Sequence, residues 1–159
     1  MSRSTRTNDM DGPVLVRLPD DARIAALARR VASIVTEEAL AAVVEHEPRM
    51  RLVHLRVFAA LESGPARASV VAARLGVSKQ AVAPVIDELV EWGHLERVSD
   101  PTDGRAKLVQ FTQVGQRIGE HVLAVVEARE RRWRRVLGGA DMEQCKRALR
   151  LMIDDATRE

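Results

Sequence analysis

Polar and cationic side chains gather in two short stretches near the middle of this chain. Ser78, Lys79 and Gln80 stand together at a predicted helix start, where hydroxyl, ammonium and amide groups can donate to phosphate oxygens or base edges. Ala83 follows one turn later and is small enough to contact a thymine methyl group. The second stretch holds Arg97, Arg105 and Lys107. Together these residue types predict a surface that binds nucleic acid.

The first stretch belongs to a predicted helix-turn-helix. Ser69 is the expected N-cap of a short helix through Leu75, and Gly76 is the residue type that commonly ends a helix in the left-handed conformation. Ser78 then caps a second helix, which extends to Trp92. Apolar residues in this second helix recur at three- and four-residue steps, so they mark a buried face opposite the polar one. Two helices joined by a tight glycine turn are typical of this motif.

The second stretch belongs to a predicted β-hairpin. After Gly93 the period falls to that of strands, and the turn-forming sequence DPTDG separates two such runs. A hairpin with arginines near its tip is suited to the minor groove, where the negative potential is strongest in narrow A·T tracts. Asp103 stands two residues before Arg105, and we expect it to orient that guanidinium and limit nonspecific binding.

Long amphipathic helices are predicted on both sides of this central region, because apolar residues recur there every three or four positions. Their predicted ranges are 20–47, 50–61, 112–137 and about 141–157. Asp20 and Asp21 suit the positive end of the first helix. The length of 159 residues fits one domain over 19–159, preceded by a polar arm over 1–18.

Composition and spacing exclude several other classes of protein. The net charge of +2 means that the basic surface must be local, and the single cysteine excludes both an intrachain disulfide and a thiolate metal cluster. The four histidines include no closely spaced ligand pair, so we expect neither metal nor cofactor. We find no nucleophile–base pair and no glycine-rich phosphate loop, and therefore do not expect an enzyme. No window is a signal peptide or membrane span, which predicts a cytoplasmic protein without membrane contact.

The stretch GPARASVVAARLGVSKQAVAPVIDELVEWGHLERVSDPTDGRAKLVQFT, residues 64–112, resembles the winged helix-turn-helix core of the MarR family of bacterial transcription regulators. Its hairpin is especially similar, because the Asp, Pro, Arg and Thr residues stand where the family's DPxDxRxxxVxLT pattern expects them. The resemblance implies a mainly α fold. In that fold a DNA-binding lobe over about 50–111 carries a two-stranded β wing, and long dimerisation helices over about 20–47 and 112–157 flank it.

The same resemblance implies a homodimeric repressor, or less often an activator, on palindromic double-stranded DNA. Two recognition helices would lie about one DNA turn apart, each in the major groove with its wing in the minor groove. The apolar stripes of the three long helices independently favour a dimer, because they exceed what the central lobe can cover. A monomeric helical bundle would show similar stripes.

The family is commonly controlled by a small effector, often phenolic or anionic, bound between the dimer helices and the DNA-binding lobe. Arg51 and His54 on the second helix are the candidate ligand-binding residues here, since either could donate to an anion beside an apolar wall. The alternative from another class is a winged-helix module that binds protein or RNA, because a fold does not dictate its partner.

Pro84 departs from the family, whose members often carry a polar residue at that position. Proline removes the amide that would bond to the Gln80 carbonyl, at a cost of roughly 3 kcal/mol in a regular helix. One hypothesis is that the helix is kinked, so that Lys79 and Gln80 are re-aimed in the groove. The other is a tolerated defect at an exposed site.

Overall fold

The structure is a computed structural model that describes residues 19–156 and 158 of the chain, so the predicted arm over 1–18 lies outside the described residues. The elements follow one another as α1 (Ile24–Val44), α2 (Leu52–Ala60), β1 (Ala66–Arg67), α3 (Ala68–Leu75), α4 (Lys79–Glu91), β2 (Leu95–Asp100), β3 (Asp103–Phe111), α5 (Gln113–Leu137) and α6 (Gly139–Ala156). This arrangement confirms the mainly helical fold with a small β wing.

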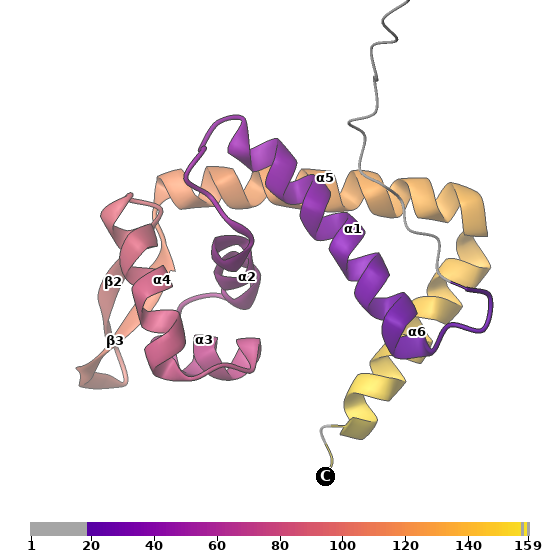
Figure 1. Ribbon diagram of the computed structural model, residues 1–159. Coiled ribbons are helices and arrows are strands. Elements are labelled where there is room, and N and C mark those ends of the chain that lie inside the picture. The colour runs from indigo at the N-terminus through magenta and orange to yellow at the C-terminus, as the bar shows by residue number, and fades with distance from the viewer. Residues whose placement is uncertain (1–18, 157, 159) are drawn as a thin grey trace, which may run out of the picture.

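A compact lobe forms from α2, α3, α4 and a three-stranded antiparallel sheet in the order β1-β3-β2 (Figure 1). The apolar stripe of α4 builds much of its core: Val82, Ile86 and Leu89 are at most 2% exposed. Leu55 and Phe58 of α2 pack into the same core. Burial of this one face leaves the opposite face of α4 at the surface of the lobe.

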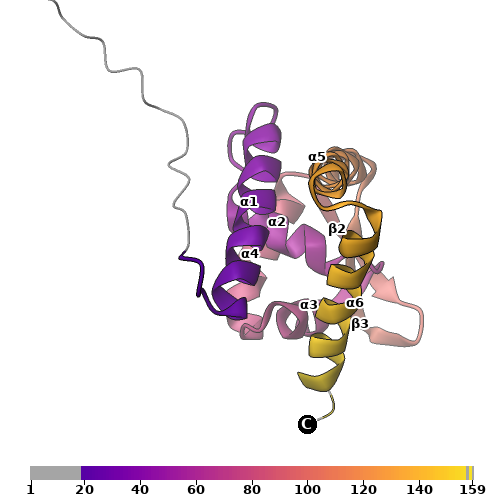
Figure 2. The same ribbon diagram turned by 90° about the vertical axis from the view of Figure 1, so that its right-hand side faces the viewer.

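The two longest helices extend away from the lobe. In Figure 1, α5 runs from the wing across the whole molecule and α1 crosses it, while α6 folds back from the far end of α5. Figure 2, which looks along α5, places α1 and α6 on different sides of that helix. An ion pair between Glu38 of α1 and Arg129 of α5 joins the two long helices, with the Arg129 Nε 2.8 Å from the carboxylate. No helix within residues 19–156 is long and apolar enough to cross a lipid bilayer.

Several predicted local signals are confirmed. Gly76 ends α3 in the left-handed conformation, with φ 66° and ψ 32°. Ser78 caps α4, since its hydroxyl accepts a hydrogen bond from the Ala81 amide at 3.1 Å. Thr112 caps α5 in the same way through the Gly115 amide. Each of these caps is a contact between residues close together in the chain, which is why sequence spacing predicts them.

Two local predictions are wrong, and one short strand was not predicted. α1 begins at Ile24, so Asp20 and Asp21 lie in a turn in front of the helix, where the Ala22 amide bonds to the Pro19 carbonyl. Ser69 is not the N-cap of α3, because the helix begins at Ala68. β1 was not predicted; its two residues pair with Leu108 and Val109 of β3. A strand of two residues is too short to show the alternation of apolar and polar residues by which a sequence reveals a strand.

Candidate nucleic-acid interface

The polar face of α4 lies open to solvent at its N-terminal end. Ser78, Lys79, Gln80 and Pro84 are all exposed, while Ala83 is half-buried. The Ser78 hydroxyl is used by the N-cap, but Lys79 and Gln80 are free to reach outward from the first turn of the helix. Helix N-termini also carry partial positive charge, so this end of α4 suits contact with phosphate oxygens.

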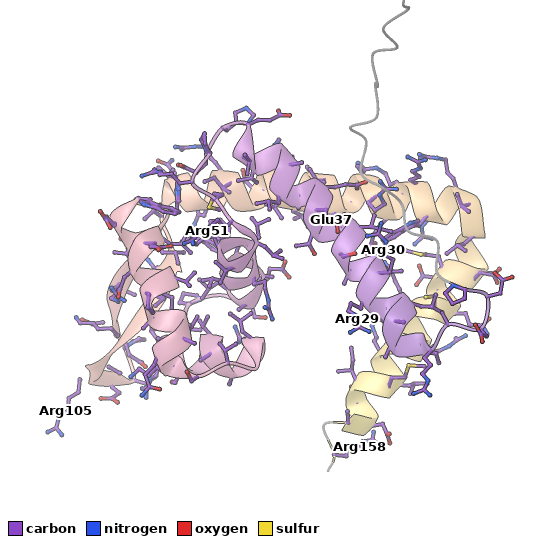
Figure 3. All side chains as sticks on the ribbon, in the orientation of Figure 1. Arg29, Arg30, Glu37, Arg51, Arg105 and Arg158 are labelled. Atoms are coloured by element: carbon purple, nitrogen blue, oxygen red, sulfur yellow. The ribbon has the colours of Figure 1, made fainter. Side chains whose placement is uncertain are left out.

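The wing extends the cationic surface beyond α4. Lys107 of β3 donates from Nζ to the Ser99 hydroxyl of β2 at 3.0 Å. Arg105 projects from the end of the hairpin, away from the body of the lobe (Figure 3). In the described part of the chain, its guanidinium makes no hydrogen bond or ion pair. An extended cation at the tip of a hairpin is available for a polyanion.

A shallow groove of about 450 Å³ brings most of the predicted residues together. Its lining residues come from β1, α3, α4 and both wing strands: Arg67, Ala68, Ser69, Lys79, Ala83, Arg97, Arg105, Ala106, Lys107 and Val109. Six of the nine residues predicted to bind DNA line this groove. Ser78 and Gln80 lie beside it at the start of α4, and Asp103 lies in the wing turn. The groove therefore joins the recognition helix and the wing into one cationic surface.

Arg97 has a partner on α4 that the sequence did not suggest. Its guanidinium donates to Asp87 at 2.6 Å, an ion pair between two exposed side chains that ties β2 to the recognition helix. Asp87 stands one turn after Ala83 on the same helix face. Asp87 on α4 thus binds the wing. Arg97 both links β2 to α4 and lines the groove.

Asp103 does not orient the Arg105 guanidinium as expected. Its carboxylate accepts from the backbone amide of Arg105 at 3.1 Å, and its other oxygen accepts from Arg67 at 3.3 Å. The residue therefore shapes the backbone of the wing turn. The reason for the difference is local: a carboxylate reaches a backbone amide two residues ahead more easily than a side chain that points outward.

Arg67 is a groove residue that the sequence analysis missed. It donates from Nε to the Asp100 carboxylate at 2.8 Å and so fastens the wing turn to the start of α3. Asp100 also accepts from the Thr102 amide and hydroxyl, at 2.8 and 2.7 Å. Hydrogen bonds from Thr102, followed by that from Arg67, lower the pKa of Asp100 to about 2. An ionised Asp100 therefore joins the wing turn to Arg67, the residue before α3.

Arg51 and His54, the predicted effector residues, both bind the recognition helix. Arg51 donates from Nη2 to Glu88 of α4 at 2.5 Å. His54 is fully buried, and its Nδ1 accepts a hydrogen bond from the Arg51 amide. The ring proton is therefore on Nε2, which donates to the Glu88 carboxylate at 2.7 Å. The hydrogen bond from His54 is the main cause of the lowered pKa of Glu88, and the hydrogen bond from Arg51 is the second. Both side chains therefore already have an acidic partner on α4.

Pro84 lies inside α4, which continues as one α-helix from Lys79 to Glu91. The proline ring is exposed on the polar face, next to the groove residue Ala83. The helix is therefore not broken there, and the choice between re-aimed side chains and a tolerated defect stays a question for experiment.

Comparisons with known proteins agree with this geometry. The sequence model of the MarR family matches residues 49–106, which span the helix-turn-helix and the wing turn. The match covers the DNA-binding lobe of this chain, so this part is similar to the MarR family. The fold is the winged helix-turn-helix fold of the MarR transcriptional regulators, and members of that family are not enzymes. A comparison with curated protein sequences finds no match.

Solved structures that are similar to this chain cover most of its length. One is CouR from Rhodococcus jostii RHA1 bound to p-coumaroyl-CoA, at 27% identity and a TM-score of 0.67, with 84% of this chain and 92% of that chain covered. A MarR-family transcriptional regulator from Rhodococcus sp. RHA1 has 25% identity and a TM-score of 0.64, covering 81% and 91%. CouR bound to a 23-mer DNA duplex has 21% identity and a TM-score of 0.64, covering 82% and 92%.

Proposed function

We propose that this chain is a ligand-responsive homodimeric repressor in the cytoplasm that binds a pseudo-palindromic operator. The observation that carries the proposal is the groove in which Lys79 of α4 meets Arg97, Arg105 and Lys107 of the wing. α4 would enter the major groove with Lys79, Gln80 and Ala83 near the bases, and the wing would follow the minor groove. Ser69, at the start of α3, would add a phosphate contact.

The dimer is supported by exposed apolar side chains at one end of the molecule. On α1, Ile24 is 61% exposed, and at the end of α5 Val136 is 76% exposed. α6 adds further exposed apolar residues near its C-terminal end: Leu149, Leu151, Met152 and Ile153. Clusters of exposed apolar side chains often mark protein–protein contacts, so we propose that a second copy of the chain covers these residues.

The effector is supported by a cavity of about 530 Å³ between α2, the end of β3 and α5. Its walls are mostly apolar, with Leu55, Phe58 and Val122 among them, and its polar residues are Glu62, Gln116 and Glu120. A phenolic hydroxyl could donate to these acceptors, whereas an anion would meet two carboxylates and no cation. CouR, solved with p-coumaroyl-CoA, provides a precedent for effector binding in a related fold.

The test measures binding of the chain to DNA from upstream of its own gene. Fluorescence anisotropy monitors this binding over a range of salt concentrations. Arg105→Ala should weaken binding to all sequences alike and reduce the salt slope by about one unit, because one phosphate contact is lost. Arg132→Ala, on α5 and far from the groove, is the matched control and should leave binding unchanged. Binding to RNA in preference to duplex DNA would favour the alternative, an interaction module.

A further inference from the structure

One acidic side chain stands beside the cationic groove. Asp87 of α4 follows Lys79 and Ala83 at four-residue steps, so the three side chains share the polar face of the helix. The Asp87 side chain is 61% exposed, and its carboxylate accepts a hydrogen bond of 2.6 Å from the Arg97 guanidinium of β2. The face of α4 that carries the predicted DNA contacts therefore also carries a carboxylate.

Arg97 differs from the other cations that α4 and the wing bring to this groove. Within the described residues, Lys79 and Arg105 make no side-chain hydrogen bond or ion pair, and Lys107 donates to a neutral hydroxyl group. Of these four cations, Arg97 is the one that the described part of the chain pairs with a carboxylate. A phosphate of DNA must therefore compete with Asp87 for the Arg97 guanidinium.

This competition is close to balanced. Both partners are exposed to solvent, and an ion pair between exposed side chains contributes little to stability. A guanidinium binds the oxygens of a carboxylate and of a phosphate in the same forked geometry. Moving Arg97 from Asp87 to a phosphate therefore gains little affinity, unless the carboxylate that is left behind finds a new donor.

The backbone of a DNA duplex offers no such donor, because its phosphate and sugar oxygens accept hydrogen bonds. In the major groove the donors are the amino groups of cytosine and adenine, and a carboxylate can accept from the cytosine amino group. Without such a partner, the Asp87 carboxylate would stand near phosphates of the same charge. The base sequence of the duplex thus decides whether the release of Arg97 is favourable.

We propose that Asp87 is a specificity-determining residue of the DNA-binding surface. On the operator its carboxylate accepts from the amino group of a cytosine or adenine, while Arg97 moves to the DNA backbone. On a duplex without an amino group at that position, Arg97 stays on Asp87 and the complex lacks one phosphate contact. The inference rests on the proposed operator binding, and it adds a residue that was not among the predicted DNA contacts.

Fluorescence anisotropy of the full chain tests this proposal with the fragment from upstream of its own gene, single base substitutions of that fragment, and a scrambled duplex of equal composition. Asp87→Ala should tighten binding to the scrambled duplex by about tenfold at about 0.1 M salt and steepen the salt slope by about one unit, because Arg97 is released to a phosphate. It should also reduce the preference for cytosine or adenine at one position of the upstream fragment by about tenfold, as expected for the loss of a charge-assisted hydrogen bond.

Two further variants separate the causes of these changes. In an Arg97→Ala background, Asp87→Ala should no longer tighten binding to the scrambled duplex. Glu127→Ala is the matched control, because it removes a carboxylate from an exposed ion pair with Arg131 on α5 and changes the net charge equally. It should leave binding to both duplexes unchanged. Circular dichroism of each variant should match that of wild type, since all of these side chains are exposed.

The outcomes that overturn the proposal are distinct from failure of operator binding. If wild type binds its upstream DNA but Asp87→Ala tightens every duplex equally, or leaves every base preference unchanged, Asp87 does not determine specificity. If the tightening persists in the Arg97→Ala background, Asp87 acts by direct repulsion and the exchange of Arg97 is wrong. A wild-type protein that binds neither duplex overturns operator binding itself, and this inference with it.

Discussion

Gly115 lies at the contact between the first turn of α5 and the chain that leaves the recognition helix. A Cβ atom added there would stand far inside contact distance of the His94 carbonyl oxygen, 2.9 Å from its carbonyl carbon and 3.2 Å from Phe111 Cδ1. The obstacle is backbone, which cannot rotate away as a side chain can. Gly115→Ala must therefore push α5 away from residues 93–94.

The cost follows from what that shift disrupts. Over-packing a buried contact costs about 1–3 kcal/mol. Two hydrogen bonds at the joint, from the Thr112 amide to the His94 carbonyl at 3.1 Å and from the Thr112 hydroxyl to the Gly93 carbonyl at 2.6 Å, are worth about 1 kcal/mol each. The higher helix propensity of alanine relative to glycine offsets about 1 kcal/mol of this loss in stability. The net expectation is a loss of about 2–4 kcal/mol, or roughly 5–15 °C in melting temperature for a chain of this size.

Gly119→Ala provides the matched control, since it makes the same change one turn later in α5, where a Cβ would meet no atom within 4 Å. It should stabilise the protein by about 0.5–1 kcal/mol. Urea unfolding followed by circular dichroism, with all three proteins at one concentration, measures both changes. If Gly115→Ala were as stable as wild type, or if both variants shifted in the same direction, the close approach of α5 to His94 would be wrong.

Three further predictions concern the wing, the recognition helix and the dimer. The pKa of Asp100 lies below the ordinary value, so its contribution to stability is present above about pH 4 and is lost as the pH falls toward 2. The difference in unfolding free energy between wild type and Asp100→Asn should therefore become smaller over that pH window. Acid unfolding curves of the two proteins measure this difference. Pro84→Ala should change base preference at one or more operator positions in a panel of base-substituted duplexes; an unchanged preference at every position would reject the re-aiming hypothesis. Ile153→Glu places a charge on a side chain that is 63% exposed in the single chain, and it should shift sedimentation equilibrium toward monomer if α6 lies in the dimer contact. A variant that stays as dimeric as wild type would remove α6 from that contact.

The sequence by itself determined the features that depend on neighbouring residues. Helical spacing located α1 to α6 within a few residues, and the change of period after Gly93 located the wing. The N-caps at Ser78 and Thr112 were predictable because cap and amide lie three residues apart. The buried face of α4 followed from its apolar stripe, and with it the polar face that carries Lys79 and Gln80.

Only the tertiary structure decided which side chains are engaged with partners far along the chain. Arg67 meets Asp100 33 residues later, and Arg51 meets Glu88 37 residues later. No local period or spacing encodes such pairs, because they depend on where separate elements are brought by packing of the core. For the same reason the sequence could place His54 on a helix but could not show that it is buried against Glu88 rather than open to a ligand. The groove lined by β1, α3, α4 and the wing likewise exists only once these elements have packed.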